Sequence, residues 1–277
     1  MSKNSDSTDV KTIRPIIGNG KIKLADIDTK STCGFDGDKA AGLAIIDEIA
    51  LRLDALQNLL YAEQKHKVLI VLQAIDTGGK DGVIRKVFSQ INPQGVRIAC
   101  FKAPTPVELS HDYLWRVHSQ TPERGEIVVF NRSHYEDVLI TRVHDLIDDA
   151  TAKRRFRQIN DFEAMLTEEG VTVLKFFLHI SKDEQKQRLQ DRLDDPTKMW
   201  KFNIGDMAER EKWADYQRVY EDAINATSSP HSPWYVVPAD RNWVRDLYVS
   251  SVLVKTLEDL KMAYPKPADG LDKFKIV

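Results

Sequence analysis

The sequence is poor in cysteine and contains no long apolar stretch. Its two cysteines, Cys33 and Cys100, stand in unlike contexts that give neither a metal-site spacing nor a disulfide framework. This pattern fits a reducing compartment, so we expect a cytoplasmic protein. No apolar stretch reaches the roughly 20 residues that a membrane span needs. The polar sequence MSKNSDSTDVK lacks the apolar core of a signal peptide, so we expect no membrane association.

Two common catalytic motifs and an excess of charge are missing as well. The histidines do not form the H-E-x-x-H spacing of a zinc protease, and no G-x-S-x-G nucleophile elbow is present. The 40 basic and 42 acidic residues leave a formal net charge of −2. A phosphate-rich ligand must therefore meet a local basic cluster. Nucleic-acid binding is not expected, because no aromatic-interleaved basic stripe extends beyond residues 188–213.

The sequence does contain an alternation of apolar strands with amphipathic helices. Apolar, β-branched runs predict strands that are buried on both faces, at residues 67–75, 96–102, 126–130, 171–180 and 234–239. Helical spacing of apolar residues predicts helices at residues 38–63, 79–91, 108–120, 133–145, 151–168, 181–193 and 243–261. Alternation with about five strands implies an α/β protein, in which a parallel sheet has helices on both faces.

Composition also divides the chain into parts. Residues 1–35 are polar with little periodicity, and we expect an N-terminal arm there. Residues 36–265 carry the alternation and form the predicted domain, and residues 266–277 are expected to form a C-terminal tail. Residues 194–213 interrupt the alternation as a polar insertion, so the domain carries a helical lid at about 188–213.

The first candidate site is the segment LQAIDTGGKDG, residues 72–82. It resembles the phosphate loop G-x-x-x-x-G-K-[ST], with Ala74 in place of the first glycine and Asp81 in place of the Ser/Thr. A glycine-rich turn between a strand and a helix presents backbone N–H groups to anions. Asp76 and Asp81 could supply oxygen to Mg²⁺ in place of the missing hydroxyl. An ordinary glycine-rich turn is the alternative. The predicted phosphate-binding residues are Thr77, Gly78, Gly79, Lys80, Asp81 and Gly82.

The second candidate site is FNRSHYEDV, residues 130–138, at the end of a predicted strand. Ligands of open parallel sheets bind at the carboxyl ends of strands. Asn131 stands at the Walker B position, where a carboxylate usually helps to hold Mg²⁺, and Glu136 follows one helical turn later. Arg132 could bind phosphate bidentately. The alternative is a helix start, with Ser133 as N-cap and Glu136 completing a capping box, and both interpretations can hold together.

The third candidate site is a basic cluster at the polar insertion. Arg188 and Arg192 are four residues apart and share a helix face, and Lys198 and Lys201 follow with Trp200 between them. Such a cluster in a chain of balanced charge suggests a lid that closes over phosphates. A solvated pair of charged helices is the alternative, because nearby aspartates could pair with these bases.

Four blocks of the sequence together resemble the polyphosphate kinase 2 family, from about residue 35 to 260. They are LQAIDTGGKDGVIRKVF, INPQGVRIACFKAPTPVELSHDYLWRVH, GEIVVFNRSHYEDVL and RLDDPTKMWKFNIGDMAER, in the family's order. The resemblance implies a three-layer α/β/α P-loop kinase fold similar to thymidylate kinase. It also implies phosphoryl transfer between inorganic polyphosphate and nucleotides with Mg²⁺, or Mn²⁺ in its place. The SHYED version, with Glu136, looks like the class III members that phosphorylate AMP as well as ADP.

The resemblance assigns roles to the candidate residues as a hypothesis. The catalytic residues would be Asp76, Lys80, Arg132 and Glu136, and the metal site would be formed by Asp76, Asn131 and Glu136. The phosphate- and nucleotide-binding residues would include Asn131 and Arg132 beside the loop, and the polyphosphate-binding lid residues would be Arg188, Arg192, Lys198 and Lys201. The partners implied are polyphosphate, AMP, ADP and ATP, and a second copy in a homodimer or homotetramer.

Two other functions remain open at this point. An ATP-dependent nucleoside monophosphate kinase would share the fold and differ in the donor, but such enzymes usually keep the loop Ser/Thr. A non-catalytic protein that binds polyphosphate or nucleotides would bind phosphate without turnover. Lys80, the acidic residues and the lid cluster together argue against the second function. Which substrate the phosphate loop holds is not decided by the sequence.

Overall fold

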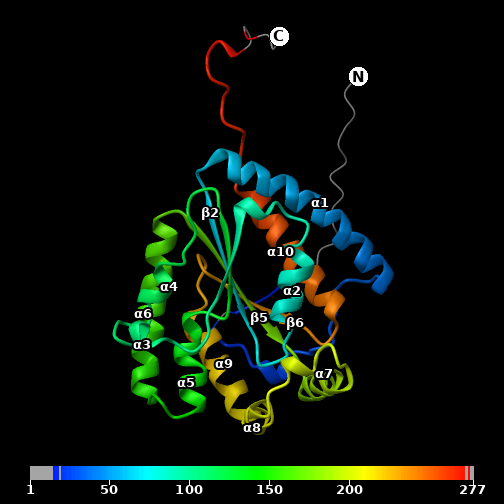
Figure 1. Ribbon diagram of the computed structural model, residues 1–277, viewed down its shortest axis with the longest axis vertical. Helices are drawn as coiled ribbons and strands as arrows, with labels where there is room; N and C mark the ends of the chain where they lie inside the picture. The colour runs from blue at the N-terminus through cyan, green and yellow to red at the C-terminus, as the bar shows by residue number, and fades with distance from the viewer. Residues whose placement is uncertain (1–14, 19, 272–273, 275–277) are drawn as a thin grey trace.

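The computed structural model describes residues 15–18, 20–271 and 274, which form a sheet covered by helices (Figure 1). The strand order is β1-β6-β5-β2-β4-β3. Five strands are parallel, as the sequence predicted: β2 (Lys67–Gln73), β3 (Val96–Cys100), β4 (Ile127–Asn131), β5 (Val171–His179) and β6 (Trp234–Pro238). Because β2 lies between β5 and β4, its carboxyl end is in the middle of the sheet.

Alternate residues of β2 enter two separate cores. Val68, Ile70 and Leu72 pack on one face of the sheet, and Leu69 and Val71 pack on the other. The first face is covered by α1 (Lys39–Glu63), α2 (Lys80–Val87) and α10 (Asn242–Asp259). The second face is covered by α6 (Asp149–Glu168) and α9 (Trp213–Thr227). The three-layer α/β/α prediction is therefore confirmed (Figure 1).

A sixth strand comes from the predicted N-terminal arm. β1 (Ile16–Ile17) pairs antiparallel with β6. The Ile16 N–H also donates to the Tyr248 hydroxyl at 2.7 Å, and the Gly18 N–H donates to the Trp234 carbonyl at 2.8 Å. Residues 1–14 and 19 of the arm lie outside the described residues, as do residues 272–273 and 275–277 of the predicted tail.

Two segments that were predicted as single helices are broken. Residues 108–120 contain the end of α3 (Pro106–Leu109) and the separate α4 (Trp115–His118). The Asp112 carboxylate accepts the N–H groups of Leu114 and Trp115, which starts a new turn there. Residues 133–145 contain the 3₁₀ helix η3 (His134–Val138) and α5 (Ile140–Val143), separated by Leu139. Both predictions are wrong, because a side-chain cap and a non-helical residue interrupt the pattern.

The segment predicted to be a lid follows β5 in the chain. α7 (Lys182–Asp194) begins after Ser181, whose hydroxyl accepts the Glu184 N–H at 3.0 Å and so caps the helix. The 3₁₀ helix η4 (Met199–Lys201) and α8 (Gly205–Glu211) follow, and α7 and α8 lie together in the lower part of Figure 1. Among the described residues, no helix combines the length and the apolar character needed to cross a membrane.

Candidate active site

The predicted phosphate loop connects the end of β2 to the start of α2. Thr77 and Gly79 have positive φ values of 64° and 101°, so the chain turns sharply just before the helix. Lys80 is buried, and its ammonium group folds back to donate to the Ala74 carbonyl at 2.9 Å. A glycine-rich turn at a helix N-terminus, with a lysine over it, is a phosphate-binding arrangement.

The charges around Lys80 oppose one another. Burial and the positive charge of Arg132 lower the pKa of the Lys80 ammonium group, whereas three nearby carboxylates raise it. Those carboxylates belong to Asp76, Glu136 and Asp81. The net effect is a Lys80 pKa below its ordinary value. A further negative charge placed beside the ammonium group would therefore stabilise its charged form.

Arg245 of α10 was not predicted as a site residue, yet its guanidinium group packs against the loop. A Cβ atom added at Gly79 would lie 2.2 Å from Arg245 Nη1, and one added at Gly82 would lie 2.8 Å from Nη2. Arg245 is 3% exposed and donates to Asp246 at 2.8 Å and to Asn242 at 2.7 Å. The two glycines therefore leave the space that this guanidinium group fills. No local signal could have found it, because α10 is distant from the loop in sequence.

We expect Gly79→Ala to reduce both stability and activity. The new methyl group would collide with Arg245, and alanine at a positive φ costs about 1–2 kcal/mol on its own. Gly170→Ala is the matched control, because Gly170 also has a positive φ of 84° but has nothing within 4 Å of an added Cβ atom. Thermal unfolding and steady-state turnover should show a larger loss for Gly79→Ala. Equal losses in the two variants would mean that Arg245 moves aside freely.

The end of β4 brings two polar pairs to the loop. Asn131 donates to Asp81 Oδ1 at 2.9 Å, and Arg132 donates to Asp76 Oδ1 at 3.0 Å. Arg132 has a positive φ of 64°, which is rare for a residue with a side chain. Burial lowers the pKa of its guanidinium group, but Glu136 and Asp76 outweigh burial and raise it. The guanidinium group is thus held in its charged form beside the phosphate loop.

Ser133 caps η3, and Glu136 lies near the basic side chains. The Ser133 hydroxyl accepts the Tyr135 N–H at 3.2 Å, so the predicted N-cap is present. Glu136 as a whole residue is half-buried. Burial raises its pKa above the ordinary value, against the opposing charges of Arg132 and Lys80. Glu136 therefore interacts with the predicted phosphate-binding groups.

The lid residues differ in how firmly they are held. Arg188 lies at the base of the lid and donates to the Thr77 carbonyl at 3.0 Å and to the Ala239 carbonyl at 2.6 Å. Arg192 donates to the Lys201 carbonyl at 3.1 Å, whereas Lys198 pairs with Asp195 at 2.7 Å. The interleaved aspartates thus take part in pairing, as the alternative interpretation expected. The loop and the lid are nevertheless directly connected through Arg188.

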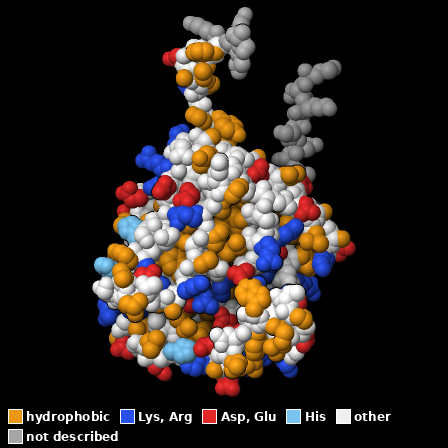
Figure 2. All heavy atoms as spheres, viewed as in Figure 1, with side chains coloured by type: hydrophobic (Ala, Val, Ile, Leu, Met, Phe, Trp, Pro, Cys, Tyr) orange, Lys and Arg blue, Asp and Glu red, His pale blue; other side chains and the backbone are white. Residues whose placement is uncertain are grey.

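Exposed apolar side chains accompany these bases on the lid. Trp200 is 77% exposed, and the Lys201 ammonium group lies 5.1 Å from the centre of its ring. Acidic and basic side chains are interspersed over the face shown in Figure 2, as expected from the balanced net charge. The exposed large apolar residues of the predicted lid are Leu193, Met199, Trp200, Ile204 and Met207.

The loop, the end of β4 and the lid surround one cavity of about 730 Å³. Every predicted site residue lines it except Glu136, which interacts electrostatically with Arg132 and Lys80. The cavity also includes residues that were not predicted: Cys100, Phe101, Lys102, Ala103 and Asp191. Cys100 is the last residue of β3 and the next three follow it, so the rule that ligands bind at strand carboxyl ends could have found these four.

The carboxylates of this cavity suit a magnesium ion that is bound mainly through phosphate. Asp76 and Asp81 flank Lys80 in the loop, and both line the cavity. Mg²⁺ is usually held by one or two carboxylates together with substrate phosphates and water. In the part of the chain that the structure describes, no group of three or more His, Cys, Asp or Glu side chains forms a metal site by itself. The donor set therefore fits a shared site completed by substrate.

Comparison with known proteins identifies the family of the chain that forms this cavity. The family description "Polyphosphate kinase 2 (PPK2)" matches residues 37–265. The chain belongs to the polyphosphate kinase 2 family. A relative from Meiothermus ruber, named AMP/ADP-polyphosphate phosphotransferase, is 55% identical over 258 residues, which cover 93% of this chain and 97% of the relative. A relative from Rhodopseudomonas palustris, named ADP-polyphosphate phosphotransferase, is 49% identical and the match covers 93% of each chain.

A solved member of the polyphosphate kinase 2 family has the same fold. The crystal structure of Polyphosphate Kinase 2 from Arthrobacter aurescens TC1 superposes with a TM-score of 0.89 at 46% sequence identity. The match covers 95% of this chain and 92% of that chain. The family resemblance and the P-loop kinase fold predicted from the sequence are both confirmed, and this member of the family is an enzyme.

Proposed function

We propose that this protein transfers the terminal phosphoryl group of inorganic polyphosphate to AMP and to ADP, giving ADP and ATP, and catalyses the reverse reactions. The observation that carries the proposal is the single cavity of about 730 Å³ that joins the phosphate loop, Arg132 and the basic lid. The names of the two relatives, which include polyphosphate together with AMP or ADP, support it.

The transfer requires no covalent bond to the enzyme. An oxygen of the acceptor's terminal phosphate forms a bond to the terminal phosphorus of polyphosphate, and the bond from that phosphorus to the bridging oxygen breaks. The polyphosphate chain leaves one unit shorter, with its new terminal oxygen carrying the negative charge. The chain's own contribution is to align the two substrates and to stabilise charge on the oxygens of the transferred group.

The residues of the cavity divide this work. Gly78, Gly79 and Lys80 would hold phosphates at the point of transfer, and Arg132 would stabilise charge on the transferred group. Lys80 and Arg132 interact with the same two carboxylates, Asp76 and Glu136, so their positive charges are close enough to act on one phosphoryl group. Arg188, at the base of the lid, would keep the loop and the lid in register because it donates to the Thr77 carbonyl.

Magnesium would supply charge neutralisation at the phosphate oxygens. Asp76 would hold it, with Asn131 or Glu136 contributing, and Mn²⁺ could take its place. Arg192, Lys198 and Lys201 would reduce the repulsion between polyphosphate and the incoming nucleotide. Closure of the lid would exclude water, so that the phosphoryl group passes to the nucleotide and is not hydrolysed.

The decisive experiment supplies polyphosphate, AMP and Mg²⁺ without ATP, and follows the nucleotides by chromatography. We expect ADP to appear first and ATP to follow, and chelation of the metal with EDTA to stop both. Added salt should raise the KM for polyphosphate, since the screening length falls from about 10 Å at 0.1 M to about 3 Å at 1 M. Binding of a polyanion to clustered bases weakens accordingly.

Three other results would each revise the proposal in a defined way. Product formation only when ADP is supplied would remove AMP from the acceptors. Product formation only when ATP replaces polyphosphate would make the protein an ordinary nucleotide kinase. Binding of polyphosphate without any product would make it a binding protein.

A further inference from the structure

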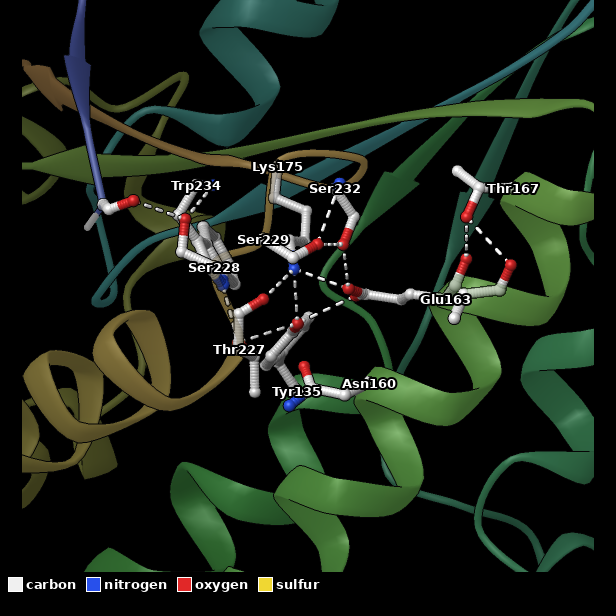
Figure 3. Close-up of polar contacts among 12 residues, drawn as sticks. Tyr135, Asn160, Glu163, Thr167, Lys175, Thr227, Ser228, Ser229, Ser232 and Trp234 are labelled. Carbon is white, nitrogen blue, oxygen red and sulfur yellow. Dashed lines mark hydrogen bonds and ion pairs between the residues drawn. The ribbon is translucent and has the colours of Figure 1, made fainter. Parts of the chain in front are cut away.

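A fully buried ion pair joins β5 to α6 (Figure 3). Lys175 is in the middle of β5 and Glu163 is on α6, and their side chains are 0% and 1% exposed. Lys175 Nζ donates to Glu163 Oε2 at 2.5 Å, to the Thr227 carbonyl at 2.7 Å and to the Tyr135 hydroxyl at 3.0 Å. All three N–H groups of the ammonium are therefore used.

Both oxygens of the Glu163 carboxylate also have hydrogen-bond partners besides Lys175. The Tyr135 hydroxyl donates to Oε1 at 2.8 Å, His134 Nε2 lies 3.3 Å from the same oxygen, and the Ser232 hydroxyl donates to Oε2 at 2.9 Å. Burial raises the pKa of Glu163, but the charge of Lys175 and the contacts of His134 outweigh it and lower the pKa to about 2. The carboxylate is ionised at neutral pH.

Stability alone does not explain such a pair. Removing two charges from water costs several kcal/mol for each ion, and replacing a buried ion pair by apolar side chains is often neutral or stabilising. β5 has apolar residues on both sides of Lys175, and an apolar residue there would continue them. A buried ion pair can instead specify one conformation, because each of its groups demands particular partners.

Two partners of this pair, His134 and Tyr135, belong to the segment that carries the site, whereas Thr227 and Ser232 do not. His134 and Tyr135 are the first residues of η3, between Arg132 and Glu136 in sequence. The Ser133 hydroxyl accepts the Tyr135 N–H at 3.2 Å and the Gln73 amide at 3.1 Å. Gln73 is the last residue of β2, so the same hydrogen bonds reach the strand that leads into the phosphate loop.

The backbone of this segment needs support. Arg132 has a φ of 64°, and a non-glycine residue in this region costs about 1–3 kcal/mol, so it persists only where its surroundings impose it. On one side, the Arg132 N–H donates to the Leu72 carbonyl at 3.2 Å. On the C-terminal side of Arg132, side-chain hydrogen bonds hold Ser133, His134 and Tyr135 in place.

We propose that Tyr135 and the Glu163–Lys175 pair are positioning residues for the phosphoryl transfer, which hold residues 131–136 so that Arg132 and Glu136 face the phosphate loop. None of the three lines the cavity, so they act through their neighbours. The catalytic part of this inference depends on the proposed function.

Tyr135→Phe tests the inference with the smallest change. The ring, which packs edge-on against Trp234 at 4.7 Å, stays in place, and only the hydroxyl is removed. We expect kcat to fall roughly 10- to 100-fold, because small misplacements of catalytic groups have effects of this size, while the KM for polyphosphate changes little. Hydrogen exchange measured by mass spectrometry should become faster in residues 131–138 than in the rest of the sheet.

Tyr248→Phe is the matched control. Tyr248 is also fully buried, and its hydroxyl accepts the Ile16 N–H at 2.7 Å within the other core of the sheet. This variant should lose thermal stability like Tyr135→Phe but keep kcat and the exchange pattern of residues 131–138. Equal changes of kcat in the two variants would overturn the inference.

A double variant separates positioning from stability. Glu163→Gln with Lys175→Met removes both charges while keeping similar volumes, so the fold should survive. We expect a melting temperature near that of the wild type, together with a lower kcat and faster exchange in residues 131–138. Normal kcat and normal exchange in the folded double variant would show that the pair has no positioning role.

The exchange measurement distinguishes this inference from the proposed function. It needs no substrate, so it reports on residues 131–138 whatever reaction the wild type catalyses. If the wild type made no ADP from polyphosphate and AMP, the proposed function would fail. Faster exchange in Tyr135→Phe would then still support the positioning of this segment, and unchanged exchange would overturn it.

Discussion

We expect Lys80→Ala to lower kcat by about 10³-fold, the size of effect seen when a preorganised donor is removed from a transition state. Lys80 is the one side chain of the phosphate loop that brings a positive charge to the loop itself. Its ammonium group is buried and bonds only to the Ala74 carbonyl among the described contacts. Truncating this buried side chain also removes packing, so we expect the melting temperature to fall by several degrees while the protein stays folded.

Lys86→Ala is the control for this variant. Lys86 is on the same helix, but its side chain is at the surface and pairs with Asp47 at 3.1 Å. We expect near-normal turnover, because a surface ion pair contributes little. Turnover of Lys80→Ala within a few-fold of the wild type would show that the loop does not hold the transferred phosphate.

The second large effect is expected for Arg132→Lys, with a loss in kcat of about 10²- to 10³-fold. Lysine keeps the charge and has the same backbone preferences, so the left-handed conformation at this position is no more strained than before. It loses the planar guanidinium group, which can bind a phosphate with two parallel hydrogen bonds while its other edge contacts Asp76. Steady-state kinetics with polyphosphate and AMP measures the loss.

Arg97→Lys makes the same chemical change at the opposite end of the sheet. Arg97 stands near the start of β3 and donates to Glu126 at 2.8 Å and Gln120 at 2.9 Å, away from the cavity. Its kcat should stay close to that of the wild type. If Arg132→Lys also kept normal turnover, a point charge would suffice at position 132 and the bidentate role would be refuted.

The parallel strands were predictable because each is a continuous apolar run, as strands buried on both faces require. The two-residue strand β1 was not, since an Ile-Ile pair within a polar segment has no measurable periodicity. The residues 108–120 and 133–145 have helical spacing, and their breaks depend on local caps such as Asp112 that spacing does not reveal. Periodicity thus predicted the layers of the fold better than it predicted where individual helices begin and end.

The residues of the candidate site also fall into those that the sequence could predict and those that it could not. The phosphate loop and Arg132 are visible in the sequence because they are local motifs that follow strands. Arg245 and Lys175 were missed because their importance arises only from tertiary contacts. A single lysine in an apolar strand gives no sign that it is fully buried, and an arginine in a C-terminal helix gives no sign that it touches Gly79.

The short strand β1 has a consequence for how copies of this protein meet. The exposed N–H and C=O groups of an unpaired edge strand are a template for strand addition by another chain, which leads to aggregation. β1 occupies those groups on β6, and the hydrogen bond from Ile16 to Tyr248 fastens it there. Two residues of the arm thus cover part of the edge of the five-residue strand β6, and releasing them would leave the backbone N–H and C=O groups of that edge free to pair with another chain.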